Sequence, residues 1–278
     1  MRLGIFAKTF AGSHPATVLA EVRAAGYCAA QYNMACSGIG SLPTAITENT
    51  AAAVRAAAET NHVEIAAASA TYNMIHPDPE KRAAGRRAFE AISAAASAMG
   101  TTLLTVCTGS RDPEDQWRAH PDNHGPAAWQ ALLDEFALIL PVAARHGITI
   151  GVEPEHGNVV NSAAAARRLL ETLQSDRVKI VLDVANLVDG APQREWQALI
   201  EAAADELHGQ IAMAHAKDCT LDGKVVAAGL GAVDFGHFVR VLHAVGFDGP
   251  LVTHGLAAQE AASVAQFLRA VLAREGIA

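Results

Sequence analysis

The chain has 278 residues, of which 51% are hydrophobic and 18% are charged, and 29 acidic against 21 basic side chains give a net charge of −8. This length and composition predict an ordered globular protein with one barrel-sized domain. No basic cluster interrupts the acidic balance. Nucleic acid is therefore not expected as the main partner, because phosphate binding depends on a high density of Lys and Arg.

Neither the N-terminus nor the cysteines indicate export or a membrane. The apolar start, Met1–Phe6, is followed by Lys8, too soon for the apolar core of a secretory signal. Charged residues or glycine interrupt every alanine-rich stretch before it becomes long enough to span a bilayer. Four cysteines without C-x-x-C pairing or zinc-finger spacing are present: Cys28, Cys36, Cys107 and Cys219. We expect buried thiols in a reducing cytoplasm.

Short apolar runs alternate with helical stretches along the first half of the chain. The predicted elements are, in order, strand Leu3–Phe6, helix Ser13–Gly26, strand Cys28–Tyr32, helix Thr47–Asn61, strand Val63–Ala68, helix Pro79–Met99 and strand Thr102–Cys107. The loop after the third strand carries Asn73 and His76 and is too polar and aromatic for a mere turn. It is therefore a candidate part of a functional site.

The longest irregular segment, Thr108–Pro126, follows the fourth predicted strand. Loops of this length in compact domains are more often functional than structural. The segment carries Arg111, whose guanidinium could clamp a carboxylate or a phosphate, and Trp117, which could form an apolar wall beside a sugar. We expect this segment to cover the mouth of an active site and to contact the substrate through Arg111.

The same alternation continues through the second half of the chain. The predicted elements are helix Ala127–Arg145, strand Ile148–Val152, helix Ser162–Leu173, strand Val178–Leu182, helix Glu195–Leu207, strand Ile211–Ala214, helix Phe235–Val245, strand Leu251–Thr253 and a last helix ending at Arg274. Such alternation predicts parallel strands joined by right-handed crossovers. We expect a single (β/α)8 TIM barrel domain over residues 1–278. An open doubly wound sheet is the rival, but no G-x-G-x-x-G follows the first strand.

Four titratable residues directly follow the predicted strands five to eight: Glu153, Asp183, His215 and His254. A barrel brings the C-terminal ends of its strands to one mouth, where these side chains would meet. Two carboxylates and two imidazoles suit one divalent metal ion, with Mn²⁺, Zn²⁺ or Co²⁺ preferred over Mg²⁺. A lone His in such a position is more often a solvated or hydrogen-bonded loop residue than a ligand. Their shared position at four strand ends is what favours a metal site.

Segments around these residues resemble the sugar phosphate isomerase/epimerase family, which has the xylose isomerase-like TIM barrel of the AP endonuclease 2 superfamily and is related to endonuclease IV. The resemblance runs nearly end to end. It is carried by Gly151–Pro154, Leu182–Asn186, His215–Asp218 and Gly229–Gly231 followed by Asp234, and it extends to Asn73 and His76. It implies the same barrel fold that the alternation of elements predicts.

In that family, a strand-five Glu, a strand-six Asp, a strand-seven His and a strand-eight Glu bind one metal ion, and both Glu residues transfer protons. The resemblance therefore implies Glu153, Asp183 and His215 as ligands. The fourth position departs from the pattern, because His254 stands where the family has Glu. Asn186 likewise stands where many members have a second His. The two-glutamate epimerase mechanism does not carry over intact, and His254 is expected as a ligand, a second base, or both.

We therefore expect a divalent-metal-dependent isomerase or epimerase of a small sugar, keto-sugar or sugar phosphate. It would act through an enediolate with Glu153 as base. The candidate substrate contacts are Lys217, Asn186, Arg111, Asn73 and His76. Ion pairing of Lys217 with Asp218, and a surface ion pair for Arg111, are the structural alternatives.

Three other functions stay open at this point. A lyase that dehydrates a keto-polyol would use the same metal site with one base and a leaving group. A phosphodiesterase similar to endonuclease IV would need more metal ligands and a more basic surface than the sequence offers. A barrel that only binds a sugar or a partner subunit would show no turnover. A homo-oligomer is compatible with the sequence.

Overall fold

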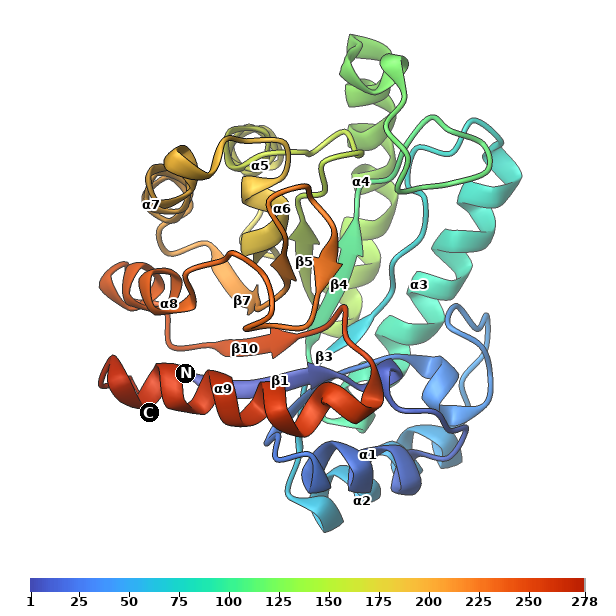
Figure 1. Ribbon diagram of the computed structural model, residues 1–278. Helices are drawn as coiled ribbons and strands as arrows, with labels where there is room; N and C mark the ends of the chain where they lie inside the picture. Colours follow the sequence, from blue (N-terminus) through green and yellow to red (C-terminus); the bar gives the residue numbers. More distant parts are fainter. Residues whose placement is uncertain (278) are drawn as a thin grey trace.

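Eight parallel strands close into a barrel in the computed structural model, which describes residues 1–277 (Figure 1). They are β1 (Arg2–Phe6), β2 (Ala29–Tyr32), β3 (Glu64–Ser69), β4 (Leu103–Cys107), β5 (Thr149–Glu153), β6 (Val178–Asp183), β7 (Ile211–His215) and β10 (Pro250–Thr253). Their order around the barrel is β1-β10-β7-β6-β5-β4-β3-β2, and pairing of β1 with β2 closes it. The predicted (β/α)8 fold is confirmed.

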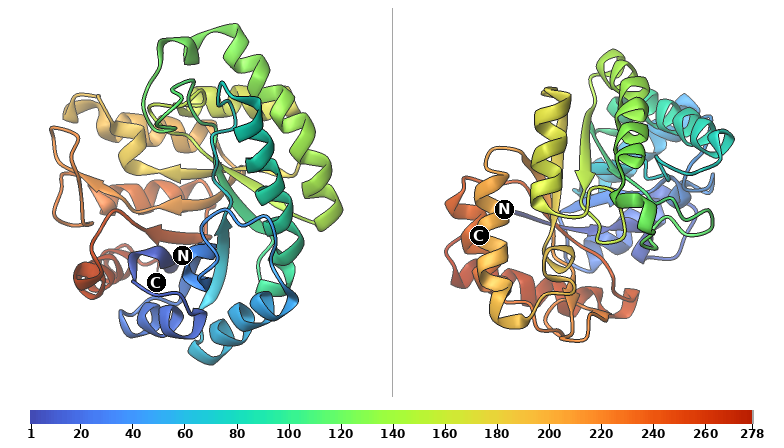
Figure 2. Two further views of the ribbon diagram at one scale, coloured as in Figure 1. Left: turned by 90° about the vertical axis from the view of Figure 1, so that its right-hand side faces the viewer. Right: turned by 90° about the horizontal axis from the view of Figure 1, so that it is seen from above.

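Helices surround the barrel on its outside (Figure 2). They are α1 (Pro15–Ala24), α2 (Glu48–Asn61), α3 (Pro79–Met99), α4 (Pro126–His146), α5 (Ala163–Leu173), α7 (Trp196–Glu206), α8 (Phe235–Ala244) and α9 (Ala261–Arg274). Local capping sets several ends: Asp78 and Ser162 accept backbone N–H groups at the starts of α3 and α5. Gly100 and Gly147 adopt left-handed conformations where α3 and α4 stop.

The barrel interior is filled in layers, and this layering positions its polar end. Apolar side chains from four strands form an inner plug: Ala67, Val181, Met213 and Val252. Side chains alternate between the two faces of a strand, so the residues two positions further along also point inward. Those residues are Ser69, Asp183, His215 and His254. A polar layer therefore lies above the apolar plug, at the C-terminal ends of the strands.

The strand β5 illustrates the same alternation on a single element. Ile150 and Val152 belong to the large apolar core between the barrel and its helices. Gly151 and Glu153 alternate with them and face the interior, where a Cβ at Gly151 would come within 2.9 Å of Val181. The apolar core thus fixes the register of β5, and this register directs the Glu153 side chain into the barrel mouth.

Several short elements were not predicted. They are α6 (Val184–Val188), the antiparallel pair β8 (Asp218–Cys219) and β9 (Val225–Val226), and the 3-10 helices η1 (Ala7–Thr9), η2 (Met34–Ser37), η3 (Pro121–His124), η4 (Gln193–Glu195) and η5 (Ala258–Glu260). The Asp218 carboxylate accepts backbone N–H groups from Gly229, Gly231 and Val233 and so organises the segment after β7. Asp218 is therefore engaged by the backbone and is not the ion-pair partner of Lys217.

One expectation about membrane segments was wrong. Helix α4 is long and apolar enough, by length and composition, to cross a bilayer. In the structure, one face of α4 packs against the barrel and buries Leu132, Phe136 and Ile139. Of the apolar stretch of this helix, 33% is buried.

Candidate active site

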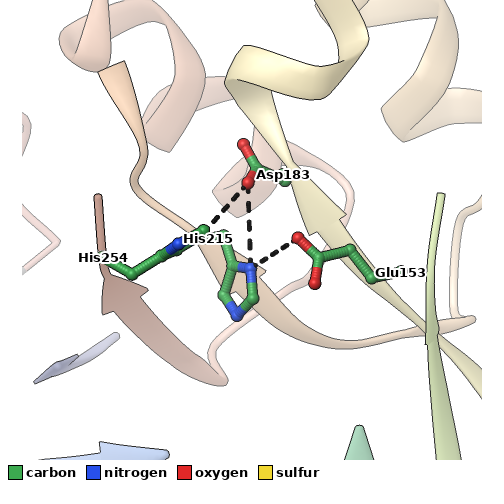
Figure 3. Close-up of side chains that lie close together, drawn as sticks. All are labelled: Glu153, Asp183, His215 and His254. Carbon is green, nitrogen blue, oxygen red and sulfur yellow. Dashed lines mark hydrogen bonds and ion pairs between the residues drawn. The ribbon is translucent and has the colours of Figure 1, made fainter. Parts of the chain in front are cut away.

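Four side chains at the C-terminal ends of the strands converge on one point (Figure 3). One potential ligand atom from each of Glu153, Asp183, His215 and His254 lies within 4.8 Å of the others. His215 Nδ1 lies 2.8 Å from Glu153 Oε1 and 3.8 Å from Asp183 Oδ2. His254 Nε2 lies 3.2 Å from Asp183 Oδ2. The structure thus brings together the four residues that the sequence picked out as metal ligands.

Both carboxylates are buried, but only one has a strong cation beside it. Lys217 Nζ lies 2.9 Å from Asp183 Oδ2. Burial opposes ionisation of Asp183, yet the Lys217 ammonium and the contact with His254 hold its pKa well below the usual range. Glu153 lacks such a partner, and burial together with repulsion by Asp183 raises its pKa to about 7. The site is short of positive charge around Glu153.

The histidine between the two carboxylates is uncharged at neutral pH. Burial lowers the pKa of His215 to about 4, against the opposing effect of Asp183. Near Glu153, Glu155 is a third carboxylate, and burial followed by repulsion from Glu153 raises the pKa of Glu155 to about 7. A neutral imidazole has a lone pair for a metal ion but contributes no charge to balance these carboxylates.

A divalent cation fits this arrangement chemically. The donor set combines two carboxylate oxygens with two imidazole nitrogens, which suits Mn²⁺, Zn²⁺ or Co²⁺ better than Mg²⁺. The charge of the ion would also supply what Glu153 lacks, since a buried carboxylate is stable only with a compensating partner.

A cavity of about 560 Å³ opens over this cluster. Its walls are formed mainly by polar side chains, with a few apolar ones. The polar ones beyond the cluster are Lys8, Gln31, Asn33, Ser41, Ser69, Thr71, Gln116 and Glu155, and the apolar ones are Phe6, Leu42, Cys107 and Trp117. A cavity with many hydroxyl and amide groups matches a small hydroxylated ligand, whose own hydroxyls need such partners.

Two of the predicted substrate contacts lie in the cluster but face its carboxylates. Lys217 Nζ donates to Asn186 Oδ1 at 2.6 Å in addition to its ion pair with Asp183. Asn186 Nδ2 donates to Pro154 O at 3.1 Å and lies 3.5 Å from Glu153 Oε1. Together they link Asp183 to Glu153 and hold the two carboxylates in place.

The other three predicted substrate contacts lie outside the cavity lining. The guanidinium of Arg111 donates to the backbone oxygens of Ile75 and Ala127, both at 3.2 Å. Asn73 donates to Ser110 O at 2.8 Å, and His76 Nε2 lies 3.0 Å from Pro113 O. These side chains join the loop after β3 to the segment 108–126. Their roles as substrate contacts stay predictions, which no contact with the cavity supports.

Sequence reasoning missed part of the cavity wall. Gln31 is 6% exposed and places its Oε1 2.8 Å from His215 Nε2. Its only signal in the sequence is one polar residue within the apolar run Ala29–Tyr32. Trp117, in contrast, was a sequence candidate for an apolar wall; it is 47% exposed and, with Gln116, brings the segment 108–126 to the mouth of the cavity. The segment reaches the site through these residues and not through Arg111.

Comparison with protein families matches residues 19–271 to the family described as the xylose isomerase-like TIM barrel. The chain belongs to this family, which confirms the resemblance seen in its motifs. Comparison with curated protein sequences gives no match.

Several solved structures of sugar epimerases have the same fold. The 3-keto-D-glucoside 4-epimerase YcjR from E. coli has a TM-score of 0.78 and 18% identity, over 97% of this chain and 99% of its own. The D-psicose 3-epimerase from Clostridium cellulolyticum H10, solved with D-tagatose, has a TM-score of 0.76 and 14% identity, over 98% and 99%. An L-ribulose 3-epimerase has a TM-score of 0.75 and 16% identity, over 99% and 94%.

Proposed function

We propose that the protein is a divalent-metal-dependent isomerase or epimerase of a small sugar, keto-sugar or sugar phosphate, with Glu153 as the base. The observation that carries the proposal is the difference between the two oxygens of Glu153. Oε1 faces the cluster, 2.8 Å from His215 Nδ1. Among the described residues 1–277, Oε2 accepts only from the thiol of Cys107, a weak donor, at 3.9 Å. A carboxylate held through one oxygen has the other available to accept a proton.

The ion would be held by Glu153 Oε1, Asp183 Oδ2, His215 Nδ1 and His254 Nε2. When bound, a divalent ion polarises a substrate carbonyl and stabilises negative charge that develops on its oxygen. Lys217 and Asn186 keep Asp183 and Glu153 in position for this task through the hydrogen bonds described above. The family membership and the epimerase folds among the solved structures support this assignment.

In the proposed reaction, Glu153 removes the proton from the carbon next to the carbonyl, and the electron pair moves to the carbonyl oxygen to give an enediolate. An isomerisation is completed by two proton transfers. Glu153 returns its proton to the former carbonyl carbon on the same face, and the proton of the adjacent hydroxyl moves to the enediolate oxygen, so that the carbonyl forms at the neighbouring carbon. Epimerisation instead requires a proton from the opposite face. His254 can supply it only through a nitrogen that does not bind the ion.

A second candidate is a lyase that dehydrates a keto-polyol on the same site. It is favoured by one observation, namely that His254 occupies the place of a second glutamate at the cluster. Glu153 would then be the single base, and the proton that it removes from carbon would pass to the hydroxyl on the next carbon, which would leave as water. A phosphodiesterase acting on nucleic acid has weaker support, since the net charge of −8 disfavours a long polyanionic ligand. A barrel that only binds a sugar would show ligand binding without turnover.

Incubation of the metal-loaded protein with free, phosphorylated and 3-keto sugars in D₂O separates these reactions. An isomerase or epimerase returns deuterium to carbon without loss of water, whereas a lyase gives a product lighter by one water. We expect deuterium incorporation that stops on addition of EDTA. Metal-independent turnover, or an absence of both exchange and product across the panel, would refute the proposal.

Variants at position 254 separate the two ways of returning the proton. His254→Ala should weaken metal binding and lower kcat, because one of the four proposed ligands is lost. His254→Glu should restore metal binding and add epimerisation, because a carboxylate returns to that position. Unchanged metal affinity in His254→Ala would show that this imidazole is not a ligand.

A further inference from the structure

We propose that Gln31 is a positioning residue that fixes the tautomer of His215, so that the lone pair of His215 Nδ1 faces the converging carboxylates. The proposal rests on the metal site proposed above, because only this tautomer can bind an ion at that point. It assigns a role to a residue outside the four ligands and outside all the sequence motifs.

Gln31 reaches His215 across the barrel interior. It lies on β2, whereas His215 ends β7, and β1 and β10 separate these two strands. Gln31 Oε1 lies 2.8 Å from His215 Nε2, and Gln31 Nε2 donates to Thr105 Oγ1 at 3.0 Å. The three side chains are buried, with Thr105 1% and His215 2% exposed. Water competes little for such buried hydrogen bonds, so they hold a defined geometry.

A neutral imidazole carries one N–H proton, and two acceptors compete for it here. Glu153 Oε1 lies 2.8 Å from His215 Nδ1, and Gln31 Oε1 lies 2.8 Å from His215 Nε2. With the proton on Nδ1, this nitrogen would donate a hydrogen bond to Glu153 and would have no lone pair for an ion. A proton on Nε2 bonds to Gln31 and leaves Nδ1 free toward Glu153 and Asp183. Gln31 therefore opposes the pull of the Glu153 carboxylate.

Thr105 sets the direction of the Gln31 amide. When the amide N–H is donated to the Thr105 hydroxyl, the amide oxygen faces His215 and accepts its Nε2–H. The reversed amide would present an N–H to His215 and would favour the proton on Nδ1, the tautomer that cannot bind an ion. Thr105 on β4, Gln31 on β2 and His215 on β7 are thus joined by a buried chain of two hydrogen bonds.

The test compares Gln31→Met, which keeps the length of the side chain without its acceptor, with Gln31→Glu, which keeps an acceptor. Ser69→Ala is the control, because it removes another polar group that lines the same cavity. Within residues 1–277, the Ser69 hydroxyl forms no hydrogen bond with the four proposed ligands. Affinity for Mn²⁺ alone is measured by titration without substrate. The tautomer of His215 is read from ¹⁵N chemical shifts of the metal-free protein labelled at histidine.

Gln31→Met should weaken Mn²⁺ binding by about 10-fold to 100-fold and raise the share of the Nδ1–H tautomer. Gln31→Glu should bind at least as tightly as the original protein, and Ser69→Ala should not differ from it. If Gln31→Met does not fold, the near-isosteric Thr105→Val should shift affinity and tautomer in the same direction.

Unchanged affinity and tautomer in the folded variant of this pair would overturn the proposal. Weakened binding in both Gln31→Met and Gln31→Glu, with no change of tautomer, would also overturn it, because the residue would then act only by filling space. Failure of the original protein to bind Mn²⁺, Zn²⁺ or Co²⁺ would instead refute the metal site itself. The two failures are therefore distinguishable without measuring turnover.

Discussion

Two buried glutamates differ in the hydrogen-bond donors and cations that surround their carboxylates. They are Glu135, on helix α4 and facing α3, and Glu153, at the barrel mouth. Glu135 is 3% exposed, and its two oxygens accept from Tyr72 Oη at 2.7 Å and from Arg86 Nη1 at 2.8 Å. Glu153 is 7% exposed, and its close neighbours include a neutral imidazole and a thiol. Each oxygen of Glu135 has a strong donor, one of them cationic, whereas neither oxygen of Glu153 has a cationic one.

The difference teaches that burial of a carboxylate does not by itself indicate function. Each oxygen of Glu135 accepts a hydrogen bond, and these bonds connect α4 to α3 and to the loop before it, which is a structural role. The incomplete pairing of Glu153 leaves room for an ion on one oxygen and for a proton on the other. A buried ionisable group without a compensating charge indicates a candidate functional site when it also faces a cavity, as Glu153 does.

The largest effect is expected from Glu153→Gln. Loss of the base should lower kcat by roughly 10³-fold, because a positioned general base contributes on that order. The melting temperature of the metal-free protein should not fall, since the variant removes a buried charge without a cation partner. Steady-state kinetics on a turned-over sugar and thermal unfolding measure the two quantities. Activity within tenfold of the original protein would contradict the role of Glu153.

The pH dependence of stability should differ between the metal-free protein and Glu153→Gln. Because the pKa of Glu153 rises from 4.5 to about 7 on folding, the native state binds its proton more tightly than the unfolded state between these values. This contribution to stability is lost as the pH rises from about 4.5 through about 7, and it amounts to on the order of 3 kcal/mol. His215 contributes with the opposite sign from about 4 to 6.5.

The original protein and Glu153→Gln both contain His215. The difference between their free energies of unfolding therefore reports the contribution of Glu153 alone. The original protein should lose stability relative to Glu153→Gln as the pH rises over this range. Urea unfolding at several pH values measures the difference, and saturating Mn²⁺ should abolish it. A difference that stays constant with pH in the metal-free proteins would refute the assignment.

A smaller effect, on stability alone, is expected from Glu135→Gln. The amide can still accept from Tyr72 but loses the charge-assisted bond to Arg86, so the free energy of unfolding should fall by about 2 kcal/mol. Affinity for a divalent ion should not change, because Glu135 lies outside the cavity lining. Urea unfolding and metal titration test both statements. A loss of metal affinity would show that the two glutamates are not independent.

The smallest effect is expected on KM, from two variants in the segment 108–126. Trp117 lines the cavity, whereas the Arg111 guanidinium is hydrogen-bonded to backbone oxygens. Trp117→Ala should raise KM about fivefold with little change in kcat, because the half-exposed ring offers a contact worth about 1 kcal/mol. Arg111→Ala should have less effect on KM, because its guanidinium is engaged by Ile75 and Ala127 backbone oxygens. The reverse ranking in kinetic measurements would instead support Arg111 as the substrate contact.

The sequence by itself determined the barrel and the position of four site residues. Apolar periodicity, glycine stops and helix caps are properties of neighbouring residues, so the predicted strands and helices agree with the structure to within one or two residues at most ends. Glu153, Asp183 and His215 close their strands, and His254 follows one. Closure of the barrel then brings these strand ends together, whatever the details of the loops.

Only the tertiary structure decided which polar groups are partners. Gln31 and His215 are 184 positions apart in the chain, and no local pattern connects them. Likewise, the donors around Glu135 come from α3 and the loop before it, whereas the strands around Glu153 offer no such pair. Hydrogen bonds and ion pairs form over about 3 Å, so their choice depends on how distant segments pack. Periodicity in the sequence determines on which side of a strand or helix a side chain lies, but it does not determine which residue of a distant segment becomes its partner.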